Sequence, residues 1–232
     1  MTPATVVIVG GTSGIGRRLA EHLARDGRPV VITGRDGDRA AGVAAEIGGD
    51  TTAATLDLCD PTSIEAALDS IEAVDHLVLM AIERDSNSVR EYDVARAIRL
   101  ATLKLVGYTE VLHRLHERMH DRSSVVLFGG LAKDRPYPGS TTVTAVNGAV
   151  STMVRTFATE LAPVRVNAIH PGIVGDSPAW INASEMLERV MERTPTGRLV
   201  TMDDVVGATL FLLGNPSVNG VNLVVDAGWM ML

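Results

Sequence analysis

The chain has 232 residues, of which 46% are hydrophobic and 21% charged, and its net charge is −7. This size and composition predict one globular domain over residues 1–232 and exclude a disordered chain. The acidic balance excludes duplex nucleic acid as an expected partner. No apolar run reaches membrane-spanning length, so we expect a cytoplasmic protein without a membrane partner.

Short apolar segments alternate along the chain with longer segments of helical periodicity. Seven segments are expected to be strands: 6–9, 30–33, 52–56, 76–80, 124–128, 164–169 and 220–225. The expected helices cover 14–26, 38–47, 93–119, 141–161, 183–192 and 202–213, and another begins at Asp60, where a capping residue precedes a proline. Strands joined by helical crossovers predict an α/β fold, a doubly wound parallel sheet of about seven strands with helices on both faces.

A glycine-rich turn joins the first expected strand to the first helix. It consists of Gly10, Gly11, Thr12, Ser13, Gly14, Ile15 and Gly16. Gly10 and Gly14 let the backbone turn sharply and approach a pyrophosphate, and Gly16 lets the helix pack closely on the sheet. The backbone N–H groups at a helix N-terminus attract phosphates. The turn therefore predicts a dinucleotide site in a Rossmann-like sheet, with a turn that holds no ligand as the alternative.

The spacing Gly-x-x-x-Gly-x-Gly and four later segments resemble the short-chain dehydrogenase/reductase family. The four segments are Asp57-Leu58, 166–172, 195–205 and 219–228, so the resemblance covers essentially the whole chain. It implies that the cofactor is held by the glycine turn and by further residues. These further residues are Arg35, Asp57, Leu58, Ala81, Pro171, Gly172 and Val174.

The end of the second strand indicates which dinucleotide is bound. Gly34 stands where an acidic residue would accept hydrogen bonds from the ribose 2′-hydroxyl of NAD, and Arg35 follows it. An arginine can bind a 2′-phosphate with two hydrogen bonds. We therefore expect NADP(H) rather than NAD(H), with a solvated loop arginine as the alternative.

The resemblance also implies a catalytic Ser after the fifth strand and a Tyr-x-x-x-Lys pair on the next helix. The Tyr position falls on Val143, the Lys position on Asn147, and the Ser position on Gly129 or Gly130. None of these side chains can perform the acid–base chemistry. The cofactor signatures are thus present while the catalytic signatures are replaced.

Two residues are weak candidates for the missing proton donor, so the catalytic residues stay unassigned. Lys104 occupies a position of the long helix that faces the active site in the family, and Tyr137 lies in the Gly/Pro-rich loop 129–139, expected over the substrate. The alternatives are a lysine that reaches from the helix to solvent and an exposed tyrosine between prolines. His170 is expected near the cofactor. No spacing of His, Cys and carboxylates predicts a metal site.

Two functions are consistent with these residues. The first is an NADP(H)-dependent oxidoreductase that transfers a hydride between the cofactor and a small carbonyl or alcohol. The second is a catalytically inactive relative that binds NADP(H) as a sensor or as a partner subunit. For the substrate, Trp180 favours an apolar or planar ligand.

The resemblance further implies a homodimer or homotetramer formed through the helices that follow the fourth and fifth strands. Those helices carry apolar residues at Ala101, Leu105, Val150, Met153 and Val154. The C-terminal residues 229–232 are also apolar, and we expect them to pack on a neighbouring subunit or over the substrate cleft.

Overall fold

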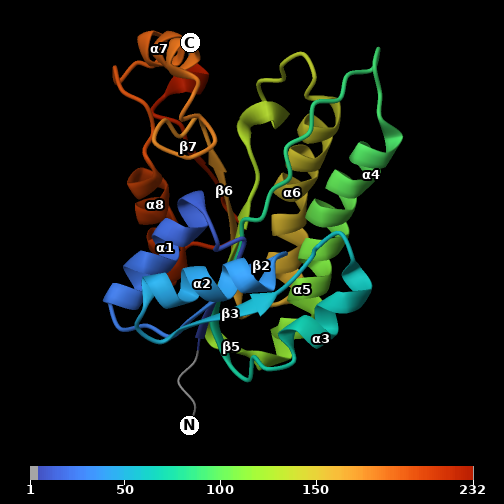
Figure 1. Cartoon of the computed structure of the whole chain (residues 1–232), viewed down its shortest axis with the longest axis vertical. Helices are drawn as coiled ribbons and strands as arrows, with labels where there is room; N and C mark the ends of the chain where they lie inside the picture. The colour runs from blue at the N-terminus through green and yellow to red at the C-terminus, as the bar shows by residue number, and fades with distance from the viewer. Residues whose placement is uncertain (1–4, 232) are drawn as a thin grey trace.

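The structure is a computed structural model and describes residues 5–231 (Figure 1). Seven strands form one sheet in the order β3-β2-β1-β4-β5-β6-β7, and every neighbouring pair is parallel. The strands are β1 Thr5–Val9, β2 Val30–Gly34, β3 Thr51–Thr55, β4 Val74–Leu79, β5 Met119–Phe128, β6 Arg165–Pro171 and β7 Asn222–Val225. The predicted doubly wound α/β architecture is confirmed.

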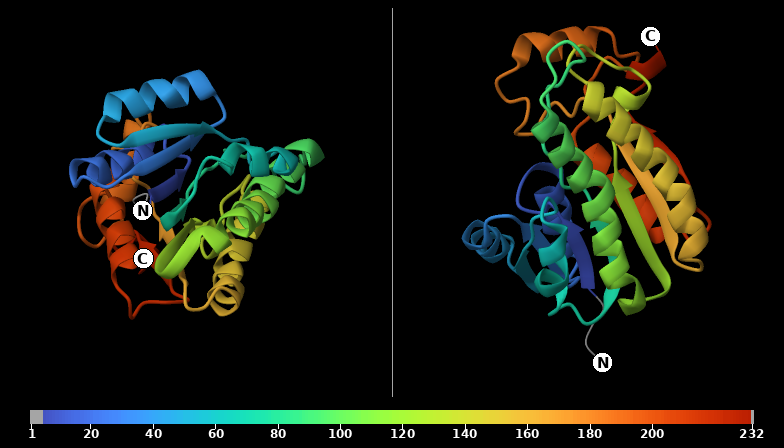
Figure 2. Two further views of the ribbon diagram at one scale, coloured as in Figure 1. Left: turned by 90° about the horizontal axis from the view of Figure 1, so that it is seen from below. Right: turned by 90° about the vertical axis from the view of Figure 1, so that its right-hand side faces the viewer.

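Helices cover both faces of this sheet. They are α1 Gly14–Arg25, α2 Gly37–Ile47, α3 Ile64–Leu68, α4 Val94–Ala101, α5 Tyr108–Leu115, α6 Thr141–Glu160, α7 Ser184–Glu192 and α8 Met202–Gly214. Figures 1 and 2 show α1, α2 and α8 on one side of the sheet and α3 to α6 on the other. None of the helices in residues 5–231 combines the length and apolar character that a membrane span requires.

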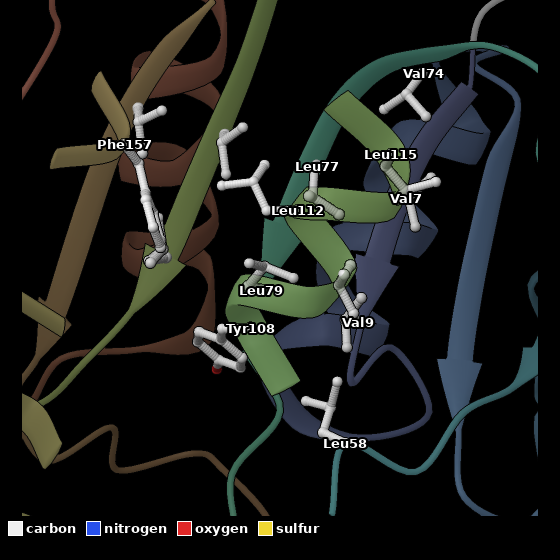
Figure 3. Close-up of a cluster of buried hydrophobic side chains, with 14 of the residues drawn as sticks. Val7, Val9, Leu58, Val74, Leu77, Leu79, Tyr108, Leu112, Leu115 and Phe157 are labelled. Atoms are coloured by element: carbon white, nitrogen blue, oxygen red, sulfur yellow. The ribbon is translucent and has the colours of Figure 1, made fainter. Parts of the chain in front are cut away.

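Two apolar clusters, one on each face, hold the layers together. Adjacent residues of a strand point to opposite faces, so that Val6 packs toward α1 and α8 while Val7 packs toward α3 to α6 (Figure 3). Both strand faces are therefore apolar, as expected for a buried parallel sheet. Each fully buried Val, Leu or Ile side chain contributes roughly 1.5–3 kcal/mol to folding.

The long helix predicted over 93–119 is interrupted and ends earlier. A π-helical segment, Thr102–Gly107, joins α4 to α5, and a 3₁₀ turn, His116–Arg118, precedes β5. The π-helical segment has i→i+5 hydrogen bonds, which change the direction of the side chains that follow, and such segments occur often at functional sites. Apolar periodicity does not predict the segment because the helices on both sides stay amphipathic.

Two local predictions need correction. The Asp60 carboxylate does not cap a helix, because Oδ1 accepts a hydrogen bond from the Thr62 hydroxyl at 2.6 Å and a 3₁₀ turn precedes α3. Val150 and Val154, expected at a subunit interface, are fully buried within this chain because α6 turns them toward the sheet. The C-terminal segment forms a 3₁₀ turn, Trp229–Met231, and Leu232 lies outside the described residues.

Candidate active site

A cavity of about 430 Å³ follows the carboxyl ends of the strands from β3 to β5. The strand order reverses between β1 and β4, and the glycine turn lies at this point, where doubly wound sheets bind their ligands. Ten of the residues predicted from the sequence line this cavity, which we call the channel. They are Gly10, Thr12, Ser13, Gly14, Ile15, Gly16, Arg35, Asp57, Leu58 and Ala81.

The glycines of the turn are required by close backbone contacts. Gly10 has a φ of +96°, and a Cβ added there would lie 2.8 Å from the Cα of Ala81. A Cβ on Gly16 would lie 2.2 Å from the carbonyl oxygen of Gly10. Any side chain at either position would displace the turn from the channel.

The first turn of α1 offers free N–H groups to the channel. Ser13 precedes the helix, but its side chain does not cap it, and the first turn contains no acidic residue. The first N–H groups of a helix have no partners within the helix, and the helix dipole gives this end a partial positive charge. Because Ser13 to Gly16 line the channel, these groups fit a pyrophosphate.

Two arginines lie at the β2 end of the channel. Arg35 follows β2, and Arg39 lies in the first turn of α2. Nη1 of Arg35 is 3.7 Å from the Glu83 carboxylate, to which Arg99 also donates at 2.8 Å. The Arg35 side chain is 61% exposed, so this ion pair is weak and leaves the guanidinium free to reorient. Arg39 is not among the residues expected from the sequence, although its position four residues after Arg35, in the first turn of the next helix, could have indicated it.

The β5 end of the channel is apolar. Met80, Ala81, Leu103, Phe128, Pro178 and Ala179 line it together with Ser177. Of the described residues that line this end, Ser177 alone carries a hydroxyl, and none is ionisable. The channel therefore has two arginines and the Asp36 carboxylate at one end, N–H groups at its centre and an apolar lining at the other end.

Three predicted cofactor residues do not line the channel. Pro171 ends the β6–β7 ladder opposite Val225, and a Cβ on the next residue, Gly172, would lie 3.0 Å from the Cβ of Asp226. Val174 is buried in the core and forms a bridge with Val200. These residues support the sheet beside the channel instead.

Lys104 lies behind the channel floor, and its exposed fraction is 2%. Its Nζ donates hydrogen bonds to the Tyr108 hydroxyl and to the Phe128 carbonyl, both at 2.7 Å. Tyr108 in turn donates to the carbonyl of Ala81 at 2.8 Å. Burial lowers the pKa of Lys104 to about 7 and raises that of Tyr108. The structure thus excludes the expected alternative of a lysine that reaches solvent.

Tyr137 is 54% exposed and lies outside the channel. It lines a separate groove with Val89, Arg90 and neighbouring residues. Its backbone N–H donates to the Ser140 hydroxyl at 3.0 Å, which holds the loop against the start of α6. The structure does not bring the Tyr137 hydroxyl to the apolar end of the channel.

The positions on which the resemblance places the Ser and the Lys, Gly129 or Gly130 and Asn147, lie together. A Cβ on Gly130 would be 2.8 Å from Nδ2 of Asn147. A Cβ on Gly129 would be 2.4 Å from Nδ1 of His170, whose Nε2 faces Oδ1 of Asn222 at 2.8 Å. Burial lowers the pKa of His170. This cluster holds a neutral imidazole and an amide, and neither is a strong acid at neutral pH.

A contact between two loops lies beside the apolar end of the channel. The Arg84 guanidinium lies 4.8 Å from the centre of the Trp180 ring, and Nη2 donates to the Ala179 carbonyl at 3.4 Å. Arg84 thus covers one face of the Trp180 ring, which was expected to contact an apolar or planar ligand. Within residues 5–231, no cluster of His, Cys and acidic side chains could hold a metal ion.

The chain matches a family model described as enoyl-(acyl carrier protein) reductase over residues 9–230. It is 32% identical to the 3-oxoacyl-(acyl-carrier-protein) reductase of Aquifex aeolicus, and the match covers 89% of this chain and 88% of the relative. It is 27% identical to the gluconate 5-dehydrogenase of Gluconobacter oxydans, with 98% and 95% covered.

Solved structures share the fold along the whole chain. A structure described as a putative betaketoacyl-ACP reductase has a TM-score of 0.88 and 30% identity, with 99% of this chain and 98% of that chain covered. A short chain oxidoreductase from Pseudomonas aeruginosa, described as containing an atypical catalytic center, has a TM-score of 0.87 and 25% identity, with 97% and 96% covered.

Proposed function

The chain belongs to the short-chain dehydrogenase/reductase family of oxidoreductases, and from this premise we propose that it binds NADP(H) and interconverts a small carbonyl and its alcohol. The channel carries this proposal, because its three parts match the three parts of the cofactor. The arginines suit a 2′-phosphate, the N–H groups of α1 suit a pyrophosphate, and the apolar end suits a nicotinamide ring.

Each part of the protein has a separate task in this proposal. Arg35 and Arg39 bind the 2′-phosphate, and Asp57 accepts a hydrogen bond from the adenine amino group. The N–H groups of the first turn of α1 hold the pyrophosphate. The bound cofactor supplies or accepts the hydride at C4 of its nicotinamide. The contact between Arg84 and Trp180 holds the loop that carries Pro178 and Ala179 beside the apolar end, which limits the access of water to it.

We further propose that this member has an atypical catalytic centre. The resemblance places the family's Ser on Gly129 or Gly130, its Tyr on Val143 and its Lys on Asn147, and the Pseudomonas relative is itself described as atypical. A general acid contributes about 10²–10⁴-fold to such reactions. We therefore expect turnover slower by this factor than that of relatives with the Tyr and Lys, and water delivers the proton.

Nucleotide titration combined with a turnover assay tests the proposal. Binding of NADPH and NADH is followed by the quenching of protein fluorescence, and oxidation of NADPH is followed against a panel of aldehydes and ketones. The proposal expects tighter binding of NADPH than of NADH and oxidation that depends on the carbonyl. Binding without turnover supports the sensor or partner-subunit function instead, and failure to bind either nucleotide overturns both.

A further inference from the structure

The chain uses lysine only twice, against nineteen arginines. Lys133 forms an ion pair with Asp134 near the surface, whereas Lys104 is almost completely buried. Arginine stays charged in proteins, while a buried lysine can lose its proton near neutral pH. Lys104, unlike the arginines, can therefore lose its charge near neutral pH.

The Lys104 ammonium lies directly behind the apolar end of the channel. It reaches one floor residue, Phe128, by a direct hydrogen bond at 2.7 Å and a second, Ala81, through the Tyr108 hydroxyl. Ala81 lies just after the end of β4, and Phe128 is the last residue of the neighbouring strand β5. Both residues line the channel. Figure 3 shows Tyr108 on its helix beside Leu79 at the end of β4.

The charge of Lys104 is not neutralised by its surroundings. The groups that face its Nζ are the Tyr108 hydroxyl from its own helix and the Phe128 carbonyl from β5, and none carries a charge at neutral pH. Burial lowers its pKa, and none of the charged groups in residues 5–231 is a cause of this shift. The field of the ammonium therefore acts on the apolar end of the channel without a counter-charge between them.

We propose that Lys104 determines which oxidation state of the cofactor the channel binds more tightly. The ring of NADP⁺ carries a positive charge, and the ring of NADPH is neutral. A protonated Lys104 repels the first and is indifferent to the second, so it favours the reduced cofactor. This inference rests on the proposed binding of NADP(H), but it does not require turnover.

The proposal fixes the sign of a pH dependence. Lys104 is charged below its pKa of about 7 and neutral above it. The affinity for NADP⁺ therefore rises as the pH rises through this range. The affinity for NADPH is not affected by the ionisation of Lys104. By linkage, bound NADP⁺ lowers the pKa of Lys104 further. For two charges separated by the floor of the channel, we expect an effect on the order of tenfold.

Calorimetric titration with NADP⁺ and NADPH at about pH 6 and about pH 9 measures this effect, since these values lie on either side of the pKa. The ratio of the two dissociation constants is compared, because the ionisation of the 2′-phosphate affects both nucleotides equally. The wild-type ratio is expected to change about tenfold between the two pH values. In Lys104→Met, the ratio of the dissociation constants should not depend on pH and should equal the ratio that the wild type has at high pH. In Lys133→Met, the ratio should change with pH as it does in the wild type.

A second measurement needs no variant that alters the buried site. Because the chain has two lysines, protein labelled with ¹³C at lysine Cε gives two signals, and Lys133→Arg assigns them. The Lys104 signal is expected to titrate at a lower pH in the NADP⁺ complex than in the NADPH complex. Equal titration in both complexes, or a ratio of affinities that does not depend on pH, overturns this proposal alone. Failure to bind either nucleotide overturns the proposed function and this inference with it.

Discussion

Arg35 illustrates how one residue can serve a ligand although it has a partner within the protein. Its guanidinium faces Glu83, which binds Arg99 with both carboxylate oxygens at 2.8 and 2.9 Å. Glu83 thus has a closer cation than Arg35, and the loose ion pair leaves Arg35 available. Local sequence predicted the position of Arg35, but it could not predict Glu83, which is 48 residues away in the chain.

Replacement of Arg35 tests the cofactor preference at the residue scale. We expect Arg35→Ala to weaken NADPH binding by about 10–100-fold, because hydrogen bonds to charged groups contribute roughly 1.5–3 kcal/mol. NADH lacks the 2′-phosphate, so its affinity should stay within a few-fold of the wild type. Fluorescence titration measures both, and Arg155→Ala, an exposed change on α6, serves as the control. An equal loss for both nucleotides would show that Arg35 does not select the 2′-phosphate.

Helix α8 shows how local sequence signals define an element. Thr201 accepts a hydrogen bond from the N–H of Asp204 at 3.1 Å, and the Asp204 carboxylate accepts one from the N–H of Thr201 at 2.9 Å. This reciprocal capping box satisfies two N–H groups at the start of the helix. Arg198 also binds Asp204, and their hydrogen bond lowers the pKa of that carboxyl to about 2.

Removal of this cap should lower stability without affecting the channel. We expect Thr201→Ala to reduce the free energy of unfolding by about 1 kcal/mol, as is typical for loss of an N-cap. Urea denaturation measures the change, and Thr152→Ala, at an exposed position within α6, serves as the control. If both variants unfold at the same urea concentration as the wild type, Thr201 does not stabilise α8 through its side chain.

The amino end of the sheet makes the whole molecule sensitive to acid. His76 on β4 is partly buried, and this burial together with the charges of Arg28 and Arg165 lowers its pKa to about 4. The unfolded chain, with an ordinary pKa of about 6.5, binds the proton first as the pH falls. The contribution of neutral His76 to stability is therefore complete above about pH 6.5 and is lost as the pH falls toward 4.

We accordingly expect the free energy of unfolding to fall by about 1–3 kcal/mol between pH 6.5 and 4 through His76. Urea denaturation at a series of pH values measures this slope. His76→Gln should flatten the slope, although it lowers stability at neutral pH, and His113→Gln at an exposed position should leave the slope unchanged. A slope that survives in His76→Gln would assign the acid sensitivity to other groups.

The assembly of several copies is the largest scale at which the sequence makes a prediction. Large apolar side chains are exposed along the helix that starts with α4, namely Val94, Ile98 and Val106. We propose that this face forms the contact of a homodimer or homotetramer, since exposed apolar patches mark such contacts.

A charge on this face should separate the subunits. Ile98→Asp is expected to reduce the molar mass in solution to that of one chain, because association would bury an unpaired carboxylate. Size-exclusion chromatography with light scattering measures the mass, and Met191→Asp on α7 serves as the control at another exposed apolar position. A wild-type mass equal to one chain contradicts the proposed contact.

The sequence by itself determined the order of strands and helices and the position of the glycine turn. These features depend on the spacing of residues close together in the chain, such as apolar periodicity and the contact of Gly16 with the carbonyl oxygen of Gly10. The tertiary structure decided which side chains line the channel at the carboxyl ends of the strands. It buried Lys104 behind the channel, turned Val150 and Val154 into the core, and left Tyr137 outside the channel. Burial and charge depend on neighbours from distant parts of the chain, and local patterns do not encode those neighbours.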